Sequence, residues 1–202
     1  MGKKGYRVLA VLLFSVAAVW YVYFHNQFYT HLNTGKMETL VAFKSEHIKG
    51  FRGQQILVHK GFEEALSRLE AYAAAQHVTL VVNQSYRKQG QKVDRAVVNP
   101  ASRSNHLVGY AIDVNIRYNG KKYFSEDLRR SNLDQLPAAI SDFIDAVRTD
   151  KSIRWGGDFR KQDPVHFDVP INHTQPKNWT AYAERCRMEV DSAPYVWEIW
   201  NW

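Results

Sequence analysis

Cysteine is nearly absent from the sequence, which has only Cys186 among 202 residues. A single cysteine excludes an intramolecular disulfide and any zinc site built from cysteine ligands. It also excludes the small secreted domains that depend on several disulfides. We therefore expect Cys186 to be a small buried residue on a C-terminal helix, in a fold held together by its hydrophobic core.

The sequence also lacks the patterns of nucleic-acid-binding proteins. Its 27 Lys and Arg outnumber 20 Asp and Glu, giving a net charge of +7, but the basic residues are scattered. No helix-turn-helix, finger or RRM pattern is present. The charge favours an anionic partner, such as a lipid surface or a cell wall, but no motif supports a binder driven by charge alone. We predict no nucleic-acid partner.

Charged residues are missing from one long stretch near the N-terminus. Residues Val8 to Phe24 form an unbroken apolar run, which as a helix spans roughly 25 Å and can cross a bilayer. Lys3, Lys4 and Arg7 precede the run and no similar cluster follows it. The positive-inside rule therefore predicts a cytoplasmic N-terminus, with everything after Phe24 outside the cytoplasm.

A cleaved signal peptide is the alternative interpretation of this run. Ser15, Val16 and Ala17 offer small residues for cleavage, but they lie inside the run and bulky aromatic residues follow them. This arrangement disfavours cleavage and favours a retained signal-anchor.

The chain divides into four regions by composition. Residues 1–26 are predicted to be a cytoplasmic stub and the signal-anchor helix, and residues 27–58 a tether and the start of the domain. Residues 59–185 are predicted to form the folded domain. Residues 186–202 form an aromatic-rich tail, with Tyr195, Trp197, Trp200 and Trp202. No repeat or low-complexity segment appears.

Hydrophobic periodicity predicts the main elements of the folded domain. Residues 61–77 have helical spacing, and the β-rich residues 78–84 read as a buried strand. Residues 109–124 read as two strands joined at Asn119-Gly120, a typical hairpin turn. A further helix is predicted at 136–147, and short strands at 153–155 and 165–169. The pattern predicts an α+β fold with a small, mainly antiparallel sheet flanked by helices, preceded by one transmembrane helix.

Two short segments concentrate residues suited to metal chemistry. The first places His106 in a loop and Asp113 at the entry to a strand, and the second places Asp163 three residues before His166. A catalytic zinc takes three nitrogen or oxygen ligands and leaves a position for water, and His106, Asp113 and His166 supply such a set. His173 is a rival ligand that fits this pattern less well.

A carboxylate and an arginine complete the candidate site. Asp163, if the Pro164 turn brings it to the metal, can accept a proton from water, and Arg87 can bind a carboxylate or stabilise an oxyanion. Each residue alone has an ordinary structural explanation, such as a turn for Asp163 or a surface charge for Arg87. Their joint occurrence favours a site.

These segments resemble the VanY-like, or M15, family of zinc D-alanyl-D-alanine carboxypeptidases and endopeptidases. The S-x-H-x-x-G-x-A-x-D pattern is matched at every fixed position, by Ser104, His106, Gly109, Ala111 and Asp113. The second segment resembles the family's W-G-G-D…D-x-x-H-F form, with Trp155, Gly156, Gly157, Asp158, Asp163, His166 and Phe167. Ser85-Tyr86-Arg87 resembles its G-Y-R element, with serine in place of glycine. The resemblance runs from about His59 to about Val169.

The resemblance implies a role for each candidate residue. His106, Asp113 and His166 would bind Zn²⁺, and Asp163 would be the general base for the metal-bound water that attacks the amide. Arg87 would contact the substrate or the reacting carbonyl, and Ser104 would lie at the edge of the site. The implied fold is that of Hedgehog and D-Ala-D-Ala peptidase domains.

The implied substrate is the peptide stem of peptidoglycan. Aspartate as base together with the W-G-G-D turn resembles the phage-endolysin branch, which cuts between L-alanine and D-glutamate. The alternatives are a D,D-carboxypeptidase of the same family and a non-catalytic zinc module that binds wall. The resemblance places the protein in a bacterial inner membrane with its domain in the periplasm, where lysis or secretion proteins are possible partners.

Overall fold

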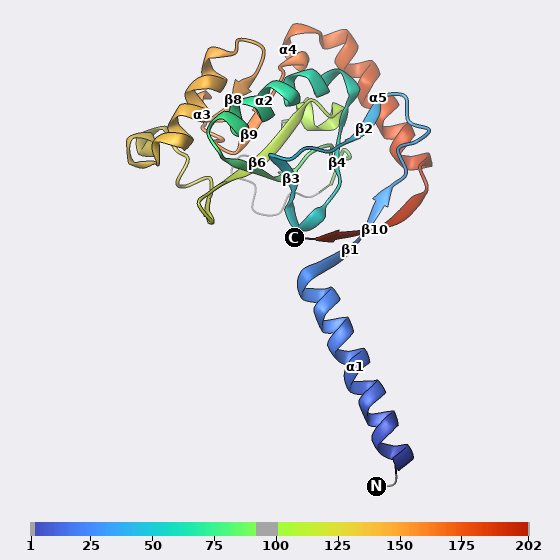
Figure 1. The fold of residues 1–202 in the computed structure, drawn as a ribbon. Helices are drawn as coiled ribbons and strands as arrows, with labels where there is room; N and C mark the ends of the chain where they lie inside the picture. Colours follow the sequence, from blue (N-terminus) through green and yellow to red (C-terminus); the bar gives the residue numbers. More distant parts are fainter. Residues whose placement is uncertain (1–2, 92–100, 202) are drawn as a thin grey trace.

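Helix α1 (Lys3–His25) projects away from the folded domain in the computed structural model, which describes residues 3–91 and 101–201 (Figure 1). Within it, Lys4–Tyr21 is long and apolar enough to cross a membrane, and none of this window is buried against the domain. The predicted N-terminal apolar helix is therefore present. Its length and composition also suit a secretory signal sequence, so they do not choose between anchor and cleaved leader.

A six-stranded, mainly antiparallel sheet forms the centre of the domain. Its strands lie in the order β3, β5, β6, β9, β8, with β7 paired to β6, and only the β3–β5 pair is parallel. Asn119 and Gly120 both have positive φ and join β6 to β7, as the hairpin prediction required. The strand bounds are β3 (Ile48–Gly50), β5 (Thr79–Gln84), β6 (Ala111–Tyr118), β7 (Lys121–Tyr123), β8 (Arg154–Trp155) and β9 (His166–Asp168).

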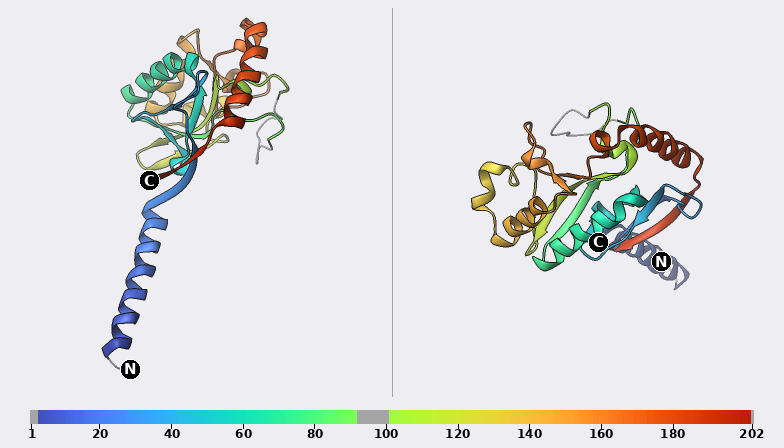
Figure 2. Two further views of the ribbon diagram at one scale, coloured as in Figure 1. Left: turned by 90° about the vertical axis from the view of Figure 1, so that its right-hand side faces the viewer. Right: turned by 90° about the horizontal axis from the view of Figure 1, so that it is seen from above.

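Helices α2 (Glu63–Ala75) and α3 (Ala138–Thr149) pack on one face of this sheet (Figure 2). Because side chains alternate along a strand, β6 sends Ile112, Val114 and Ile116 into the core beneath these helices. Asp113, Asn115 and Arg117 therefore lie on the opposite face, where they are half-buried. We call this second surface the open face of the sheet.

Four strands lie in and next to residues 27–58, the region predicted to be a tether and the start of the domain. In order they are β1 (Asn26–Leu32), β2 (Leu40–Phe43), β3, and β4 (Ile56–His59), which pairs with β2. Strand β1 pairs antiparallel with the C-terminal strand β10 (Tyr195–Asn201), from Leu32 opposite Tyr195 to Asn26 opposite Asn201. The two ends of the domain thus meet in one ribbon directly beyond α1 (Figure 1). Trp202 lies outside the described residues.

Helix α5 (Pro176–Ser192) follows the short α4 (Ile171–Thr174) and closes the remaining side of the domain. Cys186 is fully buried on α5 beside Leu40, Leu57 and Val190, as predicted. A division of the chain at residue 186 falls inside this helix. Short 3-10 turns complete the fold: η1 (Phe51–Gly53), η2 (Lys60–Phe62), η3 (Asn105–Val108), η4 (Arg130–Gln135) and η5 (Gly156–Asp158).

Candidate metal centre

Three side chains from separate elements converge on the open face of the sheet. His106 Nε2 lies 3.2 Å from Asp113 Oδ1 and 3.2 Å from His166 Nδ1, and the last two atoms are 3.0 Å apart. A tetrahedral zinc with bonds of about 2.0–2.1 Å separates its ligand atoms by roughly 3.3 Å. The three sequence-predicted ligands therefore present their donor atoms at the spacing of one face of a zinc tetrahedron.

The backbone explains why these residues meet. Asp113 on β6 and His166 on β9 are direct cross-strand partners, so their side chains share one face of the sheet. His106 comes from η3, which Ser104 caps by accepting a hydrogen bond from the His106 N–H at 3.4 Å. Gly109 ends this turn with a φ of 69°, and a Cβ there would lie 2.5 Å from the backbone nitrogen of His59. Glycine is therefore required at this position of the motif.

In both histidines, the ring nitrogen that points away from the cluster also has a polar partner. The Nδ1 of His106 lies 2.8 Å from the Ser85 carbonyl oxygen, to which it donates, leaving the Nε2 lone pair free for a metal. The Nε2 of His166 faces Asp168 Oδ2 at 3.5 Å. Such second contacts fix the ring orientation of metal-binding histidines.

Asp168 is itself held by two further residues. Arg154, its cross-strand partner, donates from Nε at 2.9 Å and from Nη2 at 2.6 Å. Asn105 donates to the same carboxylate at 2.6 Å. The sequence analysis missed these three residues. Asp168 was detectable as the residue two positions after His166, on the same face of a short strand.

The electrostatics of the cluster favour a cation. Burial tends to raise the pKa of Asp113, but His106 and His166 outweigh it and lower this pKa well below its usual range. Burial tends to lower the pKa of His166, but hydrogen bonds and charges from Asp113 and Asp168 raise it above its usual range. A buried positive charge is thus stabilised between two carboxylates, and a metal ion competes for the same place. The donor set and its charge both fit zinc.

The W-G-G-D segment shapes the turn that carries the fourth carboxylate. Gly156 accepts a hydrogen bond from the Asp163 N–H at 2.8 Å, and a Cβ on Gly156 would lie 2.3 Å from the Asp163 carbonyl oxygen. A Cβ on Gly157 would collide with the Trp155 ring, whose Nε1 donates to the Pro164 carbonyl at 2.7 Å. The two glycines therefore allow this turn to pack closely against residues 163–166.

Asp163 has the surroundings expected of a proton acceptor. Its Oδ1 is buried and has no hydrogen-bond partner in the described part of the chain. Burial and the charge of Asp113 raise the pKa of Asp163 above its usual value. A buried carboxylate oxygen without a partner costs free energy, and such groups are typical of catalytic sites.

Arg87 is a buried cation that faces the same cluster. Its side chain is 5% exposed, and burial lowers its pKa while the charge of Asp113 opposes that shift. Its guanidinium forms no ion pair with any residue in the ranges 3–91 and 101–201. A buried arginine in this state is ready to bind an anion.

The other candidates have simpler roles. Ser104 is the cap of η3, and Asp158 pairs with Arg148 at 2.8 Å, outside the cluster. His173 is exposed on α4 and does not belong to the group of side chains able to share a metal.

Comparison with known families agrees with this geometry. Residues 98–169 match the model of a peptidase family described as D-alanyl-D-alanine carboxypeptidase. This segment contains His106, Asp113, Asp163 and His166, on strands and turns that the structure brings together. Over residues 98–169 the chain is therefore similar to the M15 peptidase family.

The M15 match confirms the family predicted from the two motifs, but not its endolysin-like branch. M15 peptidases are in general zinc-dependent and act on peptidoglycan, in keeping with the His-Asp-His group of this chain. No curated protein matches the chain.

Proposed function

We propose that this M15 chain is a zinc-dependent hydrolase of the peptidoglycan stem, with L-alanyl-D-glutamate endopeptidase activity. One observation carries the proposal: three ligand atoms 3.0–3.2 Å apart lie near Asp163, whose buried Oδ1 has no hydrogen-bond partner among the described residues. A structural metal site is usually closed by four protein ligands and needs no such carboxylate.

His106, Asp113 and His166 would hold the zinc. When bound, zinc lowers the pKa of coordinated water and polarises a carbonyl. Asp163, with its raised pKa, accepts a proton from the attacking water and returns it to the departing amine. Arg87 supplies a fixed positive charge for the oxyanion or for a substrate carboxylate.

The proposed preference for the L-alanyl-D-glutamate bond rests on Asp163 and on the turn beside it. Aspartate as base and the tight Gly156-Gly157 turn resemble the endopeptidase branch rather than enzymes with glutamate as base. A D,D-carboxypeptidase, the activity for which the matched family is described, is the second candidate because the family match covers the shared ligand motif.

Digestion of purified peptidoglycan by the full-length protein in detergent tests the proposal, with products read by mass spectrometry. We expect fragments with a new N-terminal D-glutamate. Asp163→Ala should lose cleavage and keep one equivalent of zinc, while Asp158→Asn, whose residue pairs with Arg148 outside the cluster, should cleave normally. Release of D-alanine alone would assign the carboxypeptidase activity instead. Undigested wall despite bound zinc would point to a non-catalytic module.

We further propose that α1 is a retained inner-membrane anchor with a cytoplasmic N-terminus and a periplasmic domain. The basic residues before the apolar window and the absence of burial along that window support this topology. A periplasm-dependent reporter fused after Trp202 should be active, and the protein should keep its full mass in the membrane fraction. A shorter, soluble product would indicate a cleaved signal sequence.

A further inference from the structure

Basic side chains gather at the end of the open face that lies away from the metal centre. Arg117 lies on β6 and Lys122 directly opposite it on β7. Lys49 lies on β3, opposite Val81 of the strand between. Because Val81 also pairs with Asn115, Lys49 shares this face with Asn115 and Arg117.

This arrangement costs stability. Like charges directly across a strand pair are destabilising, as for Arg117 and Lys122. Lys49 and Arg117 form no ion pair with any residue that the structure describes, whereas Arg148 and Arg154 each pair with a carboxylate. Lys49 and Arg117 therefore offer two positive charges on one face that suit an anionic ligand.

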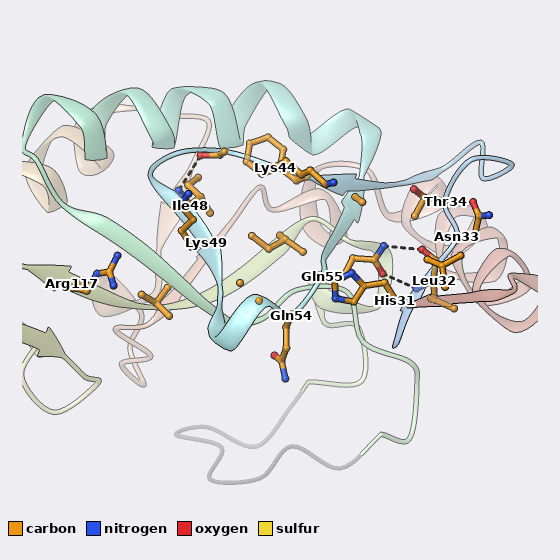
Figure 3. Close-up of a pocket in the computed structure, with 18 residues that line it drawn as sticks. His31, Leu32, Asn33, Thr34, Lys44, Ile48, Lys49, Gln54, Gln55 and Arg117 are labelled. Carbon is orange, nitrogen blue, oxygen red and sulfur yellow. Dashed lines mark hydrogen bonds between the residues drawn. The ribbon is translucent and has the colours of Figure 1, made fainter. Parts of the chain in front are cut away.

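A pocket of about 610 Å³ lies beside these cations (Figure 3). Lys44, Lys49 and Arg117 line it, and none of the described residues that line it is acidic. In Figure 3, Arg117 lies at one end of the pocket and His31, Leu32 and Gln55 lie at the other, next to the β1–β10 ribbon. Its walls also include apolar groups such as Ile48 and Ile56, so an organic chain bearing an anionic group fits it better than a free ion.

One strand carries both a residue of the pocket, Arg117, and a residue of the metal centre, Asp113. Asp113 and Arg117 are four residues apart on β6 and face the same way, so they are roughly 13 Å apart. Between them, Asn115 donates to Asn83 at 3.2 Å and forms a polar surface. An extended peptide covers 13 Å with about four residues.

We propose that the pocket is a distal subsite that binds a carboxylate of the wall peptide, about four residues from the bond that is cut. This inference rests on the proposed peptidase function and adds to it a preference for long, acidic substrates. Lys49 and Arg117 provide the charge, and the apolar walls hold the intervening peptide. Such a subsite selects peptides that extend about four residues beyond the bond over shorter ones, because a shorter fragment cannot reach both positions.

Two peptides that share the cleavable bond test the subsite. Both extend four residues beyond that bond, one ending in a carboxylate and the other in a carboxamide. Titrated into zinc-loaded, full-length Asp163→Ala, which should not cut them, the carboxylate peptide is expected to bind about tenfold more tightly. Adding Lys49→Gln and Arg117→Gln to this protein should bring the ratio to about one.

A control pair separates a local effect from a general loss of charge. Lys151→Gln with Arg185→Gln removes one exposed lysine and one exposed arginine away from the pocket, and should preserve the tenfold preference. Equal binding of both peptides to the parent protein, or a preference that survives Lys49→Gln and Arg117→Gln, would overturn the subsite.

Cleavage of the same peptides by the wild type is measured separately. If neither peptide is cut, the proposed function fails, while the binding ratio still decides the subsite.

Discussion

The Nε2 of His166 lies 3.5 Å from Asp168 Oδ2, while Nδ1 of the same ring points at Asp113. The His166 ring thus lies between two carboxylates. Asp113 is a predicted metal ligand, and Asp168 orients the ring from the other side. The Asp168 carboxylate fixes which nitrogen is available to a metal.

Asp168→Asn should therefore weaken zinc binding by about 10- to 100-fold, because the neutral amide offers His166, Arg154 and Asn105 a single acceptor oxygen in place of two charged ones. The affinity can be measured by competition with a chromogenic chelator. Asp158→Asn is the matched control, since it also removes the carboxylate partner of an arginine, Arg148, but lies outside the cluster. Equal zinc affinities in the two variants would contradict the supporting role of Asp168.

Gly109→Ala should lower the free energy of unfolding by about 2 kcal/mol or more, because the new Cβ meets the His59 nitrogen at 2.5 Å and the backbone is left-handed. Gly120→Ala isolates the backbone contribution, since Gly120 has a φ of 76° but no atom within 4 Å of the added Cβ. Gly120→Ala should lower the free energy of unfolding by about 1 kcal/mol. Chemical denaturation compares the two, and equal losses would show that the close approach of Gly109 to His59 is unimportant.

His59 should make the domain less stable in mild acid. Burial, followed by the charge of Lys60, lowers its pKa from 6.5 to about 4. The unfolded chain therefore binds a proton between pH 6.5 and 4 when the folded chain does not. Protonation of His59 therefore leaves the free energy of unfolding unchanged above pH 6.5 and lowers it by roughly 2 kcal/mol at pH 5.

The measurement is the free energy of unfolding at pH 7 and pH 5, with His59→Gln as the variant. Glutamine keeps an acceptor for the Gly61 N–H that His59 Nδ1 now binds at 2.9 Å, but does not titrate. The variant should lose less stability than the wild type on acidification. The same loss in both proteins would rule out His59 as the cause.

Glu189→Gln should loosen the start of β2. Its two carboxylate oxygens accept the backbone N–H groups of Glu38, Thr39 and Leu40 at 2.8–3.0 Å, and an amide offers an acceptor at only one position. Hydrogen exchange at these three amides should become faster, with a loss of about 2 kcal/mol in stability. Glu184→Gln, on the exposed side of α5 beside Arg187, should leave their exchange unchanged.

The elements that the sequence predicted correctly are those with strong local patterns. These patterns depend only on neighbours along the chain. They are the helical period of residues 61–77, the alternation around Asn119-Gly120 and the spacing between His106 and Asp113. The fold class followed from them, whereas the meeting of His166 with His106 and Asp113 followed from the donor types and the family resemblance. Asp163 and Arg87 were found through motif spacing, and their roles remain predictions.

What the sequence did not reveal depends on long-range contacts. Glu189 is 149 residues from Leu40, whose N–H it binds, and nothing near either residue indicates the pairing. The same holds for β1 and β10, which appear as a polar tether and an odd aromatic tail until they are paired. The acceptor role of Asp168 required knowing that β8 brings Arg154 beside it.

The β1–β10 ribbon sets how far the domain can stand from the end of α1. A disordered tether over residues 27–58 would let the domain move within roughly 30 Å of the end of α1. The seven paired residues of each strand instead form a short rod of about 23 Å. If α1 is the membrane anchor that we propose, the ribbon holds the domain at a nearly constant height above the bilayer. The distance between membrane and wall would then limit which wall strands the proposed hydrolase can reach.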